Sequence, residues 1–329
     1  MEKFISGWCD INSVPESYIL PPEIRPGNYV VPQCDTIPLI DLGGGLLGNC
    51  DRVKVVQQIV KASQEYGFFQ TKKGSALMTR NKVADYPQAL TIFRKKYTTG
   101  ETTCDINAIL LRNTSIFGPK SLLIIGKHNS ALPRPCCNRK KVVGKYSVEV
   151  RKLSLLLLDL ICEALGLECG YFSENALSQV QLMSINHYPP CPDPSLTLGL
   201  PKHSDVNLFN ILLQGEVPGL QVLKDGNWLA VEPLPTAFAI TIGYMLQVIS
   251  NGKLKSVDHR VVTNSKVART TVGTCIFPSS DSRIVPAKAL VDNCHPPLYK
   301  SFIFKDFSDT YISDIRNGIP PTERYKLQP

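Results

Sequence analysis

The chain has 329 residues, of which 43% are hydrophobic and 19% are charged, so it can form one large or two modest domains and is not globally disordered. The longest candidate stretch, around residues 153–158, is interrupted by Asp159 and is far shorter than the roughly 18 residues that span a bilayer. Residues 1–10 lack the basic and apolar regions of a signal peptide. We therefore expect a cytoplasmic protein that does not cross a membrane.

The cysteines do not indicate a disulfide framework. There are 11 of them, an odd number, and no CxxC pair occurs. A chain of this length can build a core without cross-links. We therefore expect reduced thiols that pack as small hydrophobic groups.

The net charge of +8 suggests a nucleic-acid partner, but its distribution does not. Residues 71–140 contain 13 Lys and Arg against 3 Asp and Glu, whereas the remaining residues hold 23 against 25. A nucleic-acid-binding surface more often combines several elements of a fold. We therefore predict that the protein does not bind nucleic acid.

Helical patterns dominate the first half of the chain, after a proline-rich opening. Apolar residues at helical spacing follow Asp51, a suitable N-cap, and end at Gly67, which suits a helix C-terminus. A second periodic stretch begins at Lys145 and extends to Leu167. The predicted elements are strands at 37–42 and from residue 68, and helices at 51–67, 84–97 and 146–167.

Beyond residue 167 the apolar period changes from 3.6 to 2, which is typical of strands. Turn sequences such as Asp225-Gly226-Asn227 separate the apolar runs. Strands are predicted at 182–188, 207–213, 219–223, 228–231, 237–242, 257–262 and 269–276. Seven short strands at this spacing indicate an antiparallel sandwich or barrel.

Three potential metal ligands lie in this β half. His203 and Asp205 precede the predicted strand 207–213 at a spacing that puts both side chains on one face of a strand. His259 lies on the predicted strand 257–262, which could face them across a barrel. Two imidazoles and one carboxylate form the facial triad of non-haem Fe(II) oxygenases. Because a His-x-Asp pair often arises by chance, these residues alone leave metal binding open.

A second polar cluster is predicted on two other strands. Arg269 and Thr271 share one face of their strand, as do Asn186 and Tyr188. A guanidinium beside a hydroxyl makes a fork for a carboxylate, and the tyrosine and asparagine add neutral donors. Arg269 could be a surface charge on an edge strand, but its apolar or small neighbours favour burial. The cluster suits a keto acid that chelates a metal and carries a second carboxylate.

Several segments together follow a known pattern. They are 186–192 (NHYPPCP), 198–200 (LGL), 203–205 (HSD), 212–214 (LLQ), 217–221 (VPGLQ), 250–252 (SNG), 256–261 (SVDHRV) and 269–271 (RTT). Further matches are 13–18 (SVPESY), 37–42 (IPLIDL), 67–70 (GFFQ), 142–147 (VVGKYS) and 296–299 (PPLY). With these segments the chain resembles the plant 2-oxoglutarate- and Fe(II)-dependent dioxygenases.

The resemblance implies an α+β fold with a double-stranded β-helix core, a cupin-like jelly roll. The implied divisions are an N-terminal helical and mixed region at 1–145, a supporting helix at 146–180, the jelly roll at 181–300 and a lid or tail at 301–329. Residues 304–312 could form a lid over the site or a simple packing helix.

The resemblance also implies roles for the site residues. His203, Asp205 and His259 would bind Fe(II), and 2-oxoglutarate would be held by Arg269, Thr271, Tyr188 and Asn186. Phe209 and Phe277 would line the substrate pocket, although both could equally be core residues. The expected enzyme is a monomer that uses O₂, with ascorbate as reductant, to oxidise a small metabolite such as an alkaloid or a flavonoid. Hydroxylation is the expected outcome, and 2-oxoglutarate would leave as succinate and CO₂.

Three departures from the family pattern leave alternatives open. Residues 241–244 are TIGY where the family commonly has Asn-Ile-Gly-Asp, and residues 71–74 are TKKG in place of a Val-x-Asn-His-Gly strand. Residues 71–140 as a whole do not match, which suggests a divergent replacement or a product of altered exon usage or reading frame. One alternative is therefore a non-catalytic relative that retains iron and 2-oxoglutarate. Another is a zinc hydrolase with the same triad, although hydrolysis has no use for a carboxylate clamp.

Overall fold

The computed structural model describes residues 12–29, 31–32, 37–43, 49–72, 108–109, 122–125, 137–234 and 237–328. Two largely antiparallel sheets form its centre, and among the strands that the structure describes only β1 and β2 pair in parallel. The large sheet has the order β1 (Leu39–Asp41), β2 (Phe68–Lys72), β10 (Ala237–Ile242), β7 (Phe209–Leu213), β12 (Arg269–Phe277), β5 (Val180–Tyr188), β4 (Leu122–Ile125) and β3 (Ala108–Ile109). The small sheet has the order β6 (Leu198–His203), β11 (His259–Val262), β8 (Leu220–Lys224) and β9 (Asn227–Ala230).

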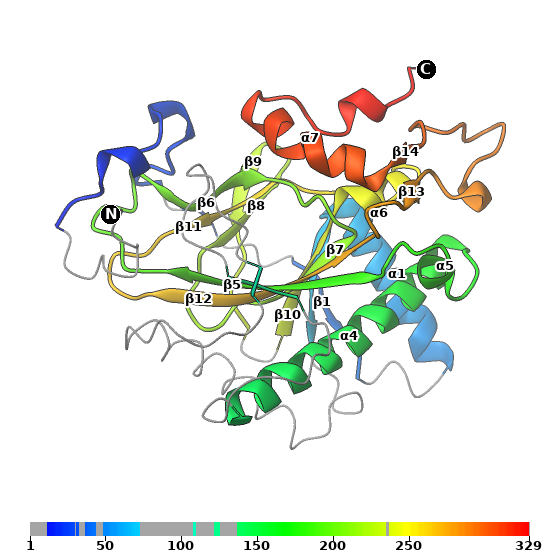
Figure 1. The fold of residues 1–329 in the computed structure, drawn as a ribbon, viewed down its shortest axis with the longest axis horizontal. Helices are drawn as coiled ribbons and strands as arrows, with labels where there is room; N and C mark the ends of the chain where they lie inside the picture. The colour runs from blue at the N-terminus through cyan, green and yellow to red at the C-terminus, as the bar shows by residue number, and fades with distance from the viewer. Residues whose placement is uncertain are drawn as a thin grey trace.

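The two faces of the large sheet have different neighbours. Residues on its outer face, including Ile211, Ile240 and Val272, join one apolar core with residues of α1 (Asn49–Glu65) and α4 (Cys137–Leu165). The two helices contact each other, and α4 runs along the large sheet (Figure 1). The inner face meets the small sheet, where Phe68 and Ala239 pack with Leu220 and Val222. Two facing antiparallel sheets with helices on one side are the predicted jelly roll, and the α+β fold class is confirmed.

Short elements and one amphipathic helix complete the fold. These elements are the 3-10 turns Glu16–Tyr18, Pro22–Ile24, Lys288–Leu290 and Glu323–Tyr325, the helices α5 (Tyr171–Glu174), α6 (Tyr244–Ile249) and α7 (Phe304–Arg316), and the strand pair β13 (Arg283–Ile284) and β14 (Phe302–Ile303). Phe304, Phe307 and Tyr311 of α7 are buried in the main core. Of the two interpretations of residues 304–312, this burial favours a packing helix.

Most strand predictions agree with the structure to within two residues, but the first helix boundaries were wrong. Asp51 is not an N-cap, because α1 already begins at Asn49. The long helix α4 begins at Cys137 and not near residue 146. Its first turns carry a basic run and Gly144, which conceal the apolar period and disfavour a helix. The predicted helix 84–97 lies outside the described residues.

Strand β6 was not predicted, because its sequence LGLPKH contains a glycine and a proline. The structure accommodates Pro201 because β6 is an edge strand of the small sheet, where a backbone without an N–H donor leaves no ladder bond unmade. Among the described residues, no helix has the length and apolar character needed to cross a membrane. The structure shows free thiols at cysteines 162, 169, 191, 275 and 294.

Candidate active site

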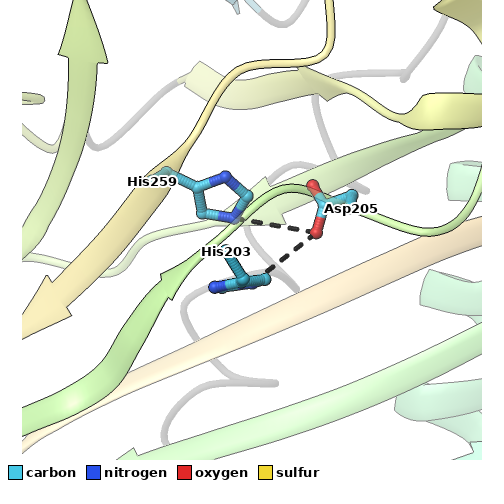
Figure 2. A group of neighbouring side chains, drawn as sticks. All are labelled: His203, Asp205 and His259. Carbon is cyan, nitrogen blue, oxygen red and sulfur yellow. Dashed lines mark ion pairs between the residues drawn. The ribbon is translucent and has the colours of Figure 1, made fainter. Parts of the chain in front are cut away.

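His203 and His259 lie directly opposite each other in the small sheet. His203 is the last residue of β6, His259 is the first residue of β11, and their Cα atoms are register partners. The expected arrangement across a barrel was therefore wrong, because the two strands are neighbours. Asp205 lies in the turn after β6 and not in a strand, yet its carboxylate reaches both rings (Figure 2).

The three side chains have the spacing of ligands to one ion. Asp205 Oδ1 lies 3.8 Å from His203 Nε2 and 3.6 Å from His259 Nε2. One ligand atom from each residue falls within 4.8 Å of the others. Metal–nitrogen and metal–oxygen bonds of about 2.1 Å allow two ligands of one ion to lie up to about 4.2 Å apart. The donor set of two imidazoles and one carboxylate suits Fe(II) and leaves coordination positions open.

Hydrogen bonds fix which nitrogen of each imidazole faces the centre. His203 Nδ1 lies 2.8 Å from the carbonyl oxygen of Pro201, and His259 Nδ1 lies 3.2 Å from that of Val257. A carbonyl can only accept, so each Nδ1 carries the proton and each Nε2 keeps a lone pair for a metal. Burial, followed by the neighbouring His259, lowers the pKa of His203 to about 4, so this ring is neutral near pH 7.

Asp205 is also held by the large sheet. Thr241 Oγ1 donates a hydrogen bond of 2.7 Å to Asp205 Oδ2, and the Tyr244 backbone N–H donates to the Asp205 carbonyl oxygen at 2.8 Å. Oδ1, the oxygen nearest the imidazoles, remains available as a ligand. Thr241 and Tyr244 are the two positions at which the TIGY segment departs from the family pattern, so both departures contact the metal-ligand loop directly.

The second predicted cluster also forms. Strands β5 and β12 pair antiparallel, which sets Arg269 opposite Tyr188 and Thr271 opposite Asn186. The Arg269 guanidinium lies 5.4 Å from the centre of the Tyr188 ring. Because paired residues of a sheet point to the same side, all four side chains lie on the inner face, towards the small sheet.

Arg269 is a buried charge with only neutral partners. It is 2% exposed, and burial lowers its pKa. Its Nε donates to the Val217 carbonyl oxygen at 3.1 Å, and its Nη2 lies 3.4 Å from Gln214 Oε1. No carboxylate of the described residues forms an ion pair with it. Thr271 Oγ1 is buried and has no hydrogen-bond partner among the described residues. A buried cation beside an unpartnered hydroxyl fits an incoming carboxylate.

Two glycines of the small-sheet side make room for this cluster. A Cβ on Gly199 would lie 2.6 Å from Cδ1 of Tyr188, and one on Gly219 would lie 3.0 Å from Cδ of Arg269. Both approaches are at or below the limit of real Cβ contacts. The glycines of the LGL and VPGLQ segments therefore let Tyr188 and Arg269 occupy the space between the sheets.

Comparisons with known proteins agree with this geometry. Residues 179–278 match the family model of the 2OG-Fe(II) oxygenase superfamily. The chain is 38% identical to hyoscyamine 6-dioxygenase of Hyoscyamus niger, with 99% of each chain covered.

The chain belongs to the 2OG-Fe(II) oxygenase superfamily.

Other members of the superfamily are similar over most of their length. Flavanone 3-dioxygenase 2 of Oryza sativa subsp. japonica is 33% identical, with 92% of this chain and 91% of the relative covered. The crystal structure of JOX2 in complex with 2OG, Fe and JA superposes with a TM-score of 0.69 at 27% identity, covering 95% of each chain. The enzyme is accordingly a 2-oxoglutarate-dependent dioxygenase whose iron triad is His203, Asp205 and His259.

The two phenylalanines expected to line the oxygenase's substrate pocket lie in or against the main apolar core. Phe209 is fully buried in the core that the large sheet shares with α1 and α4. Phe277 is partly buried against the same core, and its ring centre lies 6.1 Å from that of Phe304 in α7. Both placements favour the core interpretation that the sequence had left open.

Several contacts in the oxygenase site were not foreseen from the sequence. The sequence marked Thr241 only as a departure from the family pattern. Gln214 and Val217, which contact Arg269, were recognised only as parts of family segments. Period-2 alternation marks Thr241 as facing the same side as Ala239, but a hydroxyl's bond to a residue 36 positions away follows only from the fold.

Proposed function

We propose that the enzyme oxidises a small plant specialised metabolite, such as an alkaloid or a flavonoid, and that hydroxylation is the outcome. The support comes from relatives that span nearly the whole chain and whose names refer to hyoscyamine and flavanone. In the proposed reaction one atom of O₂ enters the metabolite, and the other enters the succinate formed with CO₂ from 2-oxoglutarate.

Within this proposal, 2-oxoglutarate is held by Arg269 and Thr271, assisted by Tyr188 and Asn186. The observation that supports this assignment is the buried Arg269, which lacks a carboxylate partner among the described residues. An isolated buried charge is costly, so a site that keeps one needs a negatively charged occupant. The Arg269 and Thr271 side chains would take the carboxylate far from the metal, while the keto-acid end chelates the ion.

The roles of the protein groups follow from their contacts. Fe(II), when bound, supplies the activation of O₂ and the redox chemistry. His203, Asp205 and His259 would hold the ion, and the hydrogen bonds of their other polar atoms with Pro201, Thr241 and Val257 orient them for it. The clamp orients 2-oxoglutarate between the sheets, and the surrounding buried side chains exclude water from it.

The remaining expectations from the sequence stay predictions. Ascorbate as reductant, a monomeric state and a cytoplasmic location belong to this proposal as well. The zinc-hydrolase alternative is not retained, because the chain belongs to an oxygenase superfamily.

The experiment is a succinate-release screen on the Fe(II)-loaded enzyme. Labelled 2-oxoglutarate is incubated with single alkaloids and flavonoids, and succinate and oxidised metabolite are measured together. We expect one metabolite class to raise succinate release at least tenfold over the enzyme alone, with one oxidised product per succinate. If 2-oxoglutarate binds but no metabolite of either class raises succinate release, the substrate proposal is wrong and the non-catalytic alternative gains support.

A further inference from the structure

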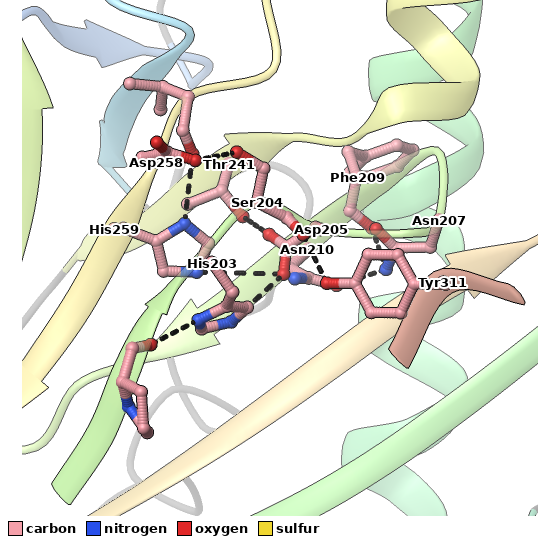
Figure 3. A network of polar contacts seen from close by, with 12 residues as sticks. His203, Ser204, Asp205, Asn207, Phe209, Asn210, Thr241, Asp258, His259 and Tyr311 are labelled. Atoms are coloured by element: carbon pink, nitrogen blue, oxygen red, sulfur yellow. Dashed lines mark hydrogen bonds and ion pairs between the residues drawn. The ribbon is translucent and has the colours of Figure 1, made fainter. Parts of the chain in front are cut away.

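A polar contact outside the triad links the two strands that carry its histidines. Lys202 and Ser204 are the residues on either side of His203, and Asp258 immediately precedes His259. Ser204 Oγ donates a hydrogen bond of 2.6 Å to Asp258 Oδ1, and Lys202 Nζ forms an ion pair of 3.1 Å with Asp258 Oδ2. One carboxylate therefore contacts both neighbours of His203 from the position next to His259, as Figure 3 shows for Ser204.

The backbone ladder is irregular at this point. His259 pairs with His203, but Val261 pairs with Leu200, so two steps along β11 correspond to three along β6. Such a bulge leaves a residue unpaired and locally disrupts the ladder. Regular pairing between β6 and β11 therefore does not continue beyond the two histidines, and side-chain contacts can add to it at this point.

Ser204 is anchored from two further directions. Tyr311 of α7 donates its hydroxyl to the Ser204 carbonyl oxygen, and the Tyr244 hydroxyl forms a hydrogen bond with the Ser204 side chain. Ser204 itself is 3% exposed. Through Ser204, α6 and α7 hold the same turn that Asp258 ties to β11.

The two contacts of Asp258 differ in strength. The Lys202 side chain is 58% exposed, so its ion pair is screened by solvent and contributes little alone. The bond from buried Ser204 to the carboxylate is short and charge-assisted, which is the stronger type. The Ser204–Asp258 bond is therefore the main link.

We propose that Asp258 is a positioning residue, which through Ser204 fixes the separation of the His203 and His259 imidazoles before the metal binds. The proposal concerns the iron triad alone and does not depend on which metabolite is oxidised.

The test is titration of the metal-free protein with Co(II) as a redox-stable probe, with Fe(II) confirming the result anaerobically. We expect Asp258→Ala and Ser204→Ala to raise the Kd for Co(II) about 10- to 100-fold, the range found when a partner of a metal ligand is removed. The double variant should stay close to either single variant, because the Ser204–Asp258 bond, the main link, is lost in all three. Ser204→Thr keeps the hydroxyl and should restore a Kd close to the original, and Lys202→Gln should have a smaller effect than Ser204→Ala.

A control variant and a second readout separate positioning from general stability. Asp309→Ala breaks an exposed ion pair with Lys305 in α7 and should leave the Kd unchanged. Thermal unfolding of each metal-free variant is measured alongside. The proposal is overturned if Asp258→Ala and Ser204→Ala lower the unfolding temperature but bind Co(II) within twofold of the original protein. Should Asp258→Ala fail to fold, the comparison of Ser204→Ala with Ser204→Thr decides.

Discussion

The two ends of the active site differ in how far the protein itself supplies partners for their polar groups. At the triad, every polar atom that does not face the metal position is engaged: both Nδ1 atoms reach backbone carbonyls and Asp205 Oδ2 accepts from Thr241. At the clamp, Arg269 has only neutral partners and Thr271 Oγ1 has none among the described residues. Side chains and backbone of the protein engage the polar atoms at one end, and under the proposed function a carboxylate of 2-oxoglutarate would engage those at the other.

Under the proposed function, this difference explains how one site can retain a metal and exchange a cosubstrate. Ligands whose other atoms are already bonded lose little freedom when the ion binds, so the metal stays. Burying the Arg269 charge without a counterion is unfavourable, and under the proposed function the bound cosubstrate would relieve this cost. Variants at the two ends should therefore affect different ligands.

The largest expected effect is at the triad. His259→Ala removes one of three donors, so we expect no iron to remain after desalting and turnover to fall to background. His295→Ala is the matched control, because His295 is exposed and bonds only to Asp292. Metal content measured by elemental analysis decides, and undiminished iron in His259→Ala would refute the triad.

At the clamp, formed by Arg269 and Thr271, Arg269→Leu should leave the affinity for the metal unchanged and lower the affinity for 2-oxoglutarate. Losing one partner of a buried charge pair costs about 3–5 kcal/mol, so the Kd for 2-oxoglutarate should rise by roughly 100-fold or more. Calorimetric titration of the metal-loaded protein measures this change. Arg283→Leu, at an exposed arginine bonded to Ser301, is the control. Equal loss of metal and 2-oxoglutarate affinity in Arg269→Leu would contradict the division between the two ends.

Thr241→Val tests whether the large sheet supports the triad, because this variant leaves Asp205 Oδ2 without its hydroxyl donor. We expect metal affinity to fall about tenfold, the lower end of the range for partners of metal ligands. Thr241→Ser retains the hydroxyl and should behave like the original protein in the same Co(II) titration. A Kd that is equal in Thr241→Val and Thr241→Ser would show that this bond does not support the triad.

The smallest effect is expected from Gly199→Ala, whose new methyl group would displace the Tyr188 ring. Displacing this one neutral donor should cost about one hydrogen bond, or roughly five- to tenfold in 2-oxoglutarate affinity. Gly144→Ala in α4 is the control, since no atom lies within 4 Å of the added Cβ. The clamp account is weakened if Gly199→Ala changes metal affinity instead.

Much of the β half could be predicted from the sequence because short apolar runs are separated by turns that carry glycine. The alternation of side chains along a strand placed Arg269, Thr271, Asn186 and Tyr188 on common faces, and their strands are indeed paired. Strand β6 escaped prediction because glycine and proline are tolerated only at its edge position. The adjacency of His203 and His259 depends on strand order, which local periodicity does not encode.

The charge distribution along the sequence indicated where the chain departs from its family. The basic excess of residues 71–140 separated that segment from the rest of the chain, and within it the structure describes Thr71–Lys72 in β2, the strands β3 and β4, and the start of α4 at residues 137–140. The polar contacts of Thr241 and Asp258 join residues 36 and 54 positions apart, so only the folded arrangement brings them together.

The most direct measurement is an anaerobic titration of the metal-free protein with Fe(II) and then 2-oxoglutarate, followed by visible absorption. We predict a weak charge-transfer band that saturates at one equivalent of Fe(II), is absent in His259→Ala, and needs roughly 100-fold more 2-oxoglutarate in Arg269→Leu. A wild-type protein that shows no band, or a band that is unchanged in both variants, would contradict a single cosubstrate held between the triad and Arg269.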